Sequence, residues 1–128
     1  MAGLNAGQGY STWPKMDGQW IPSGLLQMTP GWQNFFENAL TVQFDHRILA
    51  YSILLATLIH AWRSFTLSAM VLAYAVFTQA CLGVLTLLLH VPLAVALIHQ
   101  AGAMIVLAVA TWNLHSRLLI RSFAPNPQ

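Results

Sequence analysis

The sequence predicts an all-α, polytopic membrane protein with three spanning helices behind an N-terminal outer segment. Charged side chains make up only 6% of the 128 residues, against roughly 25% in a soluble domain. Hydrophobic residues make up 57%, which excludes a disordered chain. The single cysteine excludes a small disulfide-stabilised scaffold. An integral membrane protein is the class that remains.

Three apolar stretches are each long enough for a spanning helix, which needs ~20 mostly apolar residues. They cover about residues 42–62, 67–89 and 93–119. Pro92 suits the start of the third helix, because the first helical position does not need its N–H. The connections between the stretches are tight, so consecutive helices must be antiparallel. No stretch alternates apolar and polar residues as a membrane β-strand does.

The segment before these helices, residues 1–41, is rich in glycine, proline and tryptophan. We expect it to lie at the membrane surface. A short interfacial helix is predicted over residues 31–39, with Thr29 as its cap and Pro30 at its first position. No charged and apolar leader follows Met1 that could carry such a segment across a membrane. We therefore expect the chain to be a fragment of a larger protein with helices upstream.

Basic residues near the helix ends predict the orientation. Three lie at one end of the helices (Arg63, Arg117 and Arg121) and two at the other (Lys15 and Arg47). This bias places residues 1–41 outside, the helical domain of residues 42–120 in the membrane and a tail of residues 121–128 inside. Five scattered basic side chains form no nucleic-acid surface.

Two histidines are expected at the same depth toward the outer side. His46 lies 16 residues from Trp62, and His99 lies 18 residues from Arg117. The mismatch is about 3 Å along helices that run in the same direction. Small residues follow each by about one turn (Ala50, Gly102 and Ala103) and would leave room for a flat macrocycle. This pattern indicates bis-histidine haem ligation by His46 and His99.

Other interpretations of these polar residues stay open. A histidine on a membrane helix can simply bind a neighbouring helix, and zinc would need Asp45 or His90 as a further ligand. His60 and His115 are also matched in depth, which suits either a second, inner haem or an interfacial position. At the outer boundary, Arg47 could pair with a haem propionate.

The order of several motifs resembles the heme A synthase family over nearly the whole chain. These motifs occupy residues 2–7, 10–16, 20–22, 34–38, 42–47, 79–88, 91–93 and 99–103. The resemblance implies eight-helix membrane enzymes built from two similar four-helix halves. They oxidise a methyl group of heme O to the formyl group of heme A, the cofactor of terminal oxidases. Each half holds haem with a histidine pair, and a glutamate precedes the first histidine of the catalytic half by three residues.

The chain resembles the second, haem b-binding half, as three helices of an incomplete four-helix bundle. His46 and His99 fall on the two axial ligand positions, and Gln43 stands where the catalytic half has its glutamate. The resemblance therefore implies no catalytic residue in this part of the enzyme. Residues 1–41 lack the cysteine pair of some members, as in the cysteine-poor branch of proteobacteria and mitochondria.

The resemblance also implies the biochemical setting. We expect an oxidoreductase of heme A biosynthesis acting on a CH or CH3 group, with haem b as cofactor and without activity in the fragment alone. The expected partners are heme O and heme A, the missing N-terminal half or another copy of the chain, heme O synthase and membrane lipid. The expected location is the bacterial or mitochondrial inner membrane. Alternatives are an electron-transfer cytochrome b and a structural subunit without cofactor.

Overall fold

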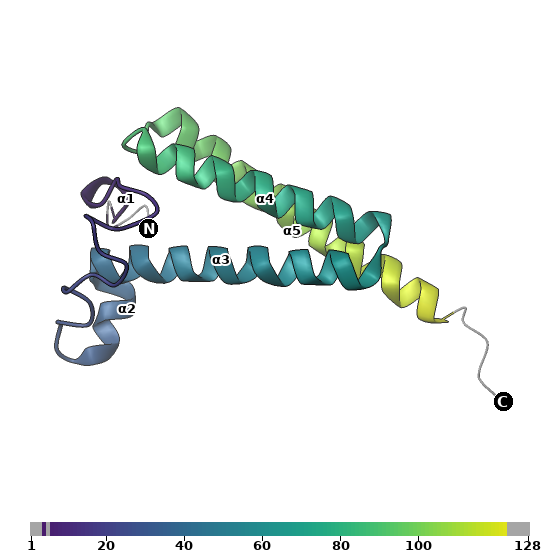
Figure 1. The fold of residues 1–128 in the computed structure, drawn as a ribbon, viewed down its shortest axis with the longest axis horizontal. Coiled ribbons are helices and arrows are strands. Elements are labelled where there is room, and N and C mark those ends of the chain that lie inside the picture. Colours follow the sequence, from purple (N-terminus) through teal and green to yellow (C-terminus); the bar gives the residue numbers. More distant parts are fainter. Residues whose placement is uncertain (1–3, 5, 123–128) are drawn as a thin grey trace.

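The computed structural model describes residues 4 and 6–122, and the elements there are helical. Short helices α1 (Ala6–Gly9), η2 (Gly31–Gln33) and α2 (Asn34–Glu37) precede the long helices α3 (Ala39–Ser64), α4 (Leu67–Leu88) and α5 (Leu93–Ser122) (Figure 1). Each long helix is long and apolar enough to cross a membrane. In the described part the only β-pairing is an isolated bridge between Met16 and Gln19. The predicted fold class is confirmed.

Local hydrogen bonds explain where the long helices begin. The side chain of Asn38 accepts from the backbone N–H groups of Leu40 and Thr41, at 3.1 and 3.2 Å. It satisfies two of the donors that a helix start leaves free, so α3 begins three residues before the expected position. Thr66 caps α4 in the same way, because its hydroxyl accepts from Ala69.

The predicted cap at Thr29 is wrong. The short helix η2 begins at Gly31, and its N-cap residue is Pro30, whose ψ of 150° is extended. The turn between residues 28 and 34 is instead held by the fully buried Asn34. Its amide oxygen accepts from the Met28 N–H, and its amide nitrogen donates to the carbonyls of Met28 and Gly31, all at 2.9 Å.

Two predictions reach beyond the described residues. Residues 2, 3 and 5 of the first family motif lie outside the described part, and so do residues 123–128 of the expected inner tail. Helix α5 continues through Ser122, so residues 121 and 122 of that tail are helical. The side chain of Arg121 is not among those described.

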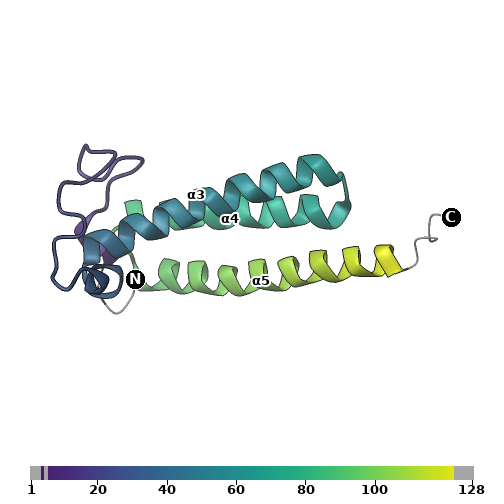
Figure 2. The same ribbon diagram turned by 90° about the horizontal axis from the view of Figure 1, so that it is seen from below.

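Helix α4 is central, because it contacts both α5 and α3 (Figure 2). Helices α3 and α5 run in the same direction and α4 runs in the opposite one. Buried small and aliphatic residues of α4 form the contact surface: Ala69, Leu72, Ala73 and Val76. Three of the four lie in the first two turns of α4. Figure 1 shows α3 diverging from α4 toward the end where α1 lies. The bundle is therefore closed at the end that carries the connection from α3 to α4, which the sequence predicts to be the inner end, and open at the opposite end, the predicted outer end.

Polar side chains join all three long helices at the closed end. The Nε2 atom of His60 on α3 lies 3.0 Å from the amide oxygen of Asn113 on α5. The amide nitrogen of Asn113 donates to the hydroxyl of Ser68 on α4, also at 3.0 Å. A second link joins Arg117 to the hydroxyl of Ser64. Within a membrane such bonds replace the water that the side chains would otherwise bind.

We expect Asn113→Ala to loosen the inner end, because it leaves His60 and Ser68 without their partner. The loss should be about 1–2 kcal/mol for two bonds between membrane helices. Thermal unfolding in detergent measures it. The matched control is Ser116→Ala, because Ser116 donates only to the Trp112 carbonyl of its own helix. Equal melting temperatures for the two variants would contradict a structural role for the link.

Candidate functional site

His99 projects from α5 onto α4, where Gln79 holds it by two contacts. The amide nitrogen of Gln79 lies 3.1 Å from Nδ1 of the imidazole and donates to the His99 carbonyl at 2.6 Å. The side chain is half-buried. Among the described residues, Nε2 of His99 has no hydrogen-bond partner, so this edge of the ring is accessible to a ligand.

Two glycines make the contact between α4 and α5 possible. A Cβ atom added to Gly83 would lie 2.9 Å from Cε1 of His99, so the imidazole rests directly on the backbone of α4. A Cβ atom added to Gly102 would overlap the amide oxygen of Gln79. The side chain of Gln79 therefore occupies the space beside Gly102, where the sequence suggested room for a macrocycle.

His46 lies on α3 at the open end of the bundle, and its side chain is exposed. His46 lies seven residues after the start of α3 and His99 six residues after the start of α5, so both are toward the same end of two helices that run in the same direction. His46 makes no hydrogen bond within the described part of the chain. The structure thus places the two predicted ligands at a similar level of the bundle. Two such imidazoles have the donor chemistry that binds a haem iron from two sides.

A zinc centre finds less support. Across residues 4 and 6–118, no group of three or more His, Cys, Asp or Glu side chains could hold a metal ion. A structural zinc site needs four ligands and a catalytic one needs three. Cys81 is exposed on α4. His90 lies in the turn after α4, where Nε2 is 3.4 Å from the hydroxyl of Ser11.

The depth-matched inner histidines also have separate surroundings. His60 is bound to Asn113, and His115 is exposed. The described contacts of His60 are those of a link between helices. The interpretation that a membrane histidine binds a neighbouring helix therefore accounts for the His60 side chain without an inner haem, whereas an interfacial position of His60 and a role for His115 stay predictions.

Arg47 is buried beside His46 and binds the outer segment. Its guanidinium donates to the carbonyls of Tyr10 and Thr12 at 3.1 and 2.9 Å. Longer contacts of 3.5 Å reach the carbonyls of Pro14 and Lys15. One side chain of α3 therefore holds residues 10–15, which we call the outer strap. The expected pairing of Arg47 with a haem propionate stays a prediction. The sequence does not indicate that Arg47 binds these backbone carbonyls.

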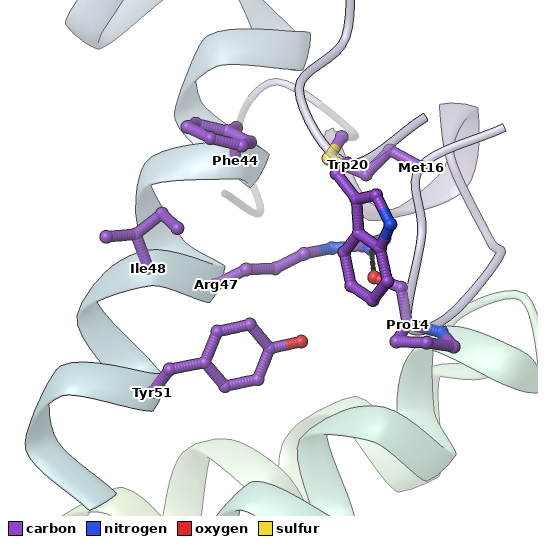
Figure 3. A pocket seen from close by; sticks show the side chains of 7 residues that line it. All are labelled: Pro14, Met16, Trp20, Phe44, Arg47, Ile48 and Tyr51. Carbon is purple, nitrogen blue, oxygen red and sulfur yellow. Dashed lines mark hydrogen bonds between the residues drawn. The ribbon is translucent and has the colours of Figure 1, made fainter. Parts of the chain in front are cut away.

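A second side chain and a pocket accompany this contact. The fully buried amide of Gln43 also donates to the Tyr10 carbonyl, at 2.9 Å. A cavity of about 240 Å³ lies between α3 and the segment that includes the strap. Figure 3 shows Arg47 crossing it toward Pro14, with Trp20 beside the guanidinium. The lining residues are Pro14, Met16, Trp20, Phe44, Arg47, Ile48 and Tyr51.

We expect Gly83→Ala to have opposite effects on stability with and without the imidazole of His99. In the otherwise unchanged chain, the added methyl group overpacks against the ring and costs about 1–3 kcal/mol. In a His99→Ala background the clash is gone, and alanine should stabilise the helix by up to about 1 kcal/mol. A double-mutant cycle by thermal unfolding measures this. The same sign in both backgrounds would contradict the packing of His99 on Gly83.

We expect Arg47→Met to release the outer strap, because methionine cannot donate to the carbonyls of residues 10–15. Trypsin should then cut after Lys15 several times faster, measured by mass spectrometry of the fragments. Arg63→Met is the control, since Arg63 is an exposed arginine at the other end of the same helix. An unchanged cleavage rate in Arg47→Met would show that the strap does not depend on the guanidinium.

Comparison with known proteins identifies close relatives. Heme A synthase of Parvibaculum lavamentivorans is 50% identical over 119 residues, which cover 90% of this chain and 35% of that protein. Heme A synthases of Bartonella tribocorum and Rhizobium etli are 48% and 49% identical over 123 residues, covering 88% of this chain and 34% of each relative. The chain thus spans about a third of the length of these curated relatives. No solved structure gives a significant match.

The family assignment follows from the extent of the match. The COX15-CtaA family, described as cytochrome oxidase assembly protein, matches residues 1–111. The matched residues include the outer strap, His46, Gln79 and His99. The resemblance to heme A synthases inferred from the sequence motifs is confirmed by these relatives. The chain belongs to the COX15-CtaA family of cytochrome oxidase assembly proteins.

Proposed function

We propose that this chain forms the haem b-binding, C-terminal half of a heme A synthase. The whole enzyme would oxidise a methyl group of heme O to the formyl group of heme A. The relatives named heme A synthase support this assignment. The observation that carries the haem-binding role is the matched position of two imidazoles, seven residues into α3 for His46 and six residues into α5 for His99. Nε2 of His99, which has no hydrogen-bond partner among the described residues, supports it further.

In this proposal, His46 and His99 would hold the haem iron, one from each of the two helices that run in the same direction. Neutral imidazole nitrogens have the donor chemistry for this, and a bound haem would supply one-electron transfer. Arg47 stands next to His46 near the outer surface. It would be a propionate partner only where the strap carbonyls leave one of its N–H groups free.

Among the described residues next to His46, neither Gln43 nor Asp45 is suited to proton transfer at this site. Gln43 is an amide, which neither gives nor takes a proton at neutral pH. Asp45 precedes His46 directly, so it points ~100° away around the helix. General acid-base catalysis is worth about 10²–10⁴-fold in rate. We therefore place the oxidation of heme O outside this chain, in the rest of the enzyme or in a complex with another copy.

The proposed setting follows from the same assignment. The enzyme would be an oxidoreductase acting on a CH or CH3 group, with heme O as substrate and heme A as product. Three spanning helices make the chain a multi-pass membrane protein, and the proposed location is the bacterial or mitochondrial inner membrane. Heme O synthase, which supplies the substrate, is the proposed neighbour. The relatives' name favours this function over an electron-transfer cytochrome b.

We expect the purified chain to bind one protohaem with a low-spin, bis-histidine spectrum. His46→Ala and His99→Ala should each abolish the low-spin signal, because each removes one axial ligand. His60→Ala and His115→Ala are matched controls at the inner end and should keep it. Reduced-minus-oxidised absorption spectra measure the result. A low-spin spectrum that survives in His99→Ala would overturn the ligand assignment.

A further inference from the structure

Gln79 is the residue of α4 that governs the orientation of His99. Its amide nitrogen reaches both Nδ1 of the ring and the carbonyl of the same residue. Gly83, one turn later on the same face of α4, supports the Cε1 edge of the ring. The imidazole is therefore fixed by two residues of one helix, and Nε2 has no hydrogen-bond partner among the described residues.

The contact with Gln79 bears on which ring nitrogen of His99 carries the proton. The amide nitrogen carries two hydrogens, so it can donate to the carbonyl and to Nδ1 together. An Nδ1 atom that accepts a hydrogen bond carries no proton, which leaves the proton of the neutral ring on Nε2. A ring in this tautomer does not bind a metal through Nε2, because that nitrogen has no free lone pair.

A glutamine can bind either tautomer of the imidazole. Its amide nitrogen donates to an unprotonated Nδ1, and its amide oxygen accepts from an Nδ1–H group. A half-turn of the amide brings its oxygen to Nδ1, where it accepts from an Nδ1–H group. This turn gives up the donor contact to the His99 carbonyl, and the side chain must also move away, because the present amide nitrogen is only 2.6 Å from that carbonyl oxygen. The amide oxygen now fills the space that a Cβ atom on Gly102 would take, and the amide nitrogen lies there after the turn. Gln79 can therefore follow the proton from Nε2 to Nδ1.

We propose that Gln79 is the positioning residue of His99. It holds the ring in place before haem binds and accepts from Nδ1–H once Nε2 coordinates iron. The proposal rests on the proposed function, in which His99 is an axial ligand. A hydrogen bond to the second nitrogen of a ligating histidine fixes its orientation and raises its basicity. Gln79 would thus set both the affinity for haem and the electron density that His99 gives to the iron.

Three variants of the full chain test this role with protohaem as the probe. Gln79→Met keeps a similar volume but removes both hydrogen-bonding groups. Gln79→Glu restores an acceptor for Nδ1–H. Gln100→Leu is the control, because Gln100 is the exposed neighbour of His99 on the same helix. Protohaem titration, electron paramagnetic resonance of the ferric form and redox titration are the readouts. Thermal unfolding without haem checks that each variant folds.

Gln79→Met should weaken protohaem binding by about 10–100-fold, broaden the low-spin resonance and raise the midpoint potential. Gln79→Glu should recover the affinity and lower the midpoint potential below that of the unchanged chain, because a carboxylate makes the ring more basic. Gln100→Leu should change none of these values. A merely structural Gln79 would not give opposite shifts of potential in its two variants.

Two results would overturn the proposal. One is a folded Gln79→Met variant that binds protohaem with unchanged affinity and potential. The other is a folded Gln79→Glu variant whose affinity and potential match those of Gln79→Met. Both leave the proposed function intact if His99→Ala still loses the low-spin spectrum. A low-spin spectrum in His99→Ala would instead remove the proposed function itself, so the two failures are distinguishable.

Discussion

Polar side chains inside a membrane must find partners within the protein, and the arrangement of this chain follows from where they do. The hydrocarbon region has no water to bind them, so each unsatisfied group is costly. At the inner end, the side chain of Asn113 forms hydrogen bonds with both His60 and Ser68. Toward the outer side, Gln79 does so with His99. Helix α4 supplies Ser68 and Gln79 to these links, and both residues bond to α5.

At the predicted outer end, a charged side chain donates to backbone carbonyl groups, whereas the links described above are made mainly between side chains. Residues 10–15 follow an irregular path, so their carbonyls are not used by a helix. A guanidinium carries five N–H donors in a fixed plane, which suits several carbonyls that converge from one strap. Arg47 can therefore be buried among neutral acceptors without a carboxylate. The same contact also places the strap next to His46, because the two side chains are adjacent in sequence.

The sequence predicts the long helices well and their contacts poorly. Apolar length alone locates α3, α4 and α5 to within about three residues, since a spanning helix is defined by a local property. Gln79 and Gly83 are four residues apart and share a helix face, but their contacts with His99 on α5 are given only by the structure. The four carbonyl partners of Arg47 come from residues more than 30 positions away, and no local pattern encodes them. Thr29 failed as a cap because the buried Asn34 holds that turn.

The two predicted ligands, His46 and His99, lie on helices that are held by different parts of the chain. His99 is fixed relative to α4 by Gln79 and Gly83, and α5 is also linked to α4 through Asn113. His46 is on α3, whose described polar links to the other long helices lie at the inner end. Toward its outer end, α3 is instead held by Arg47 and Gln43 to the strap and by Tyr51, whose hydroxyl accepts from Trp13 at 2.9 Å. The described polar contacts of α3 near His46 are thus made with the outer segment, whereas those of α5 near His99 are made with α4.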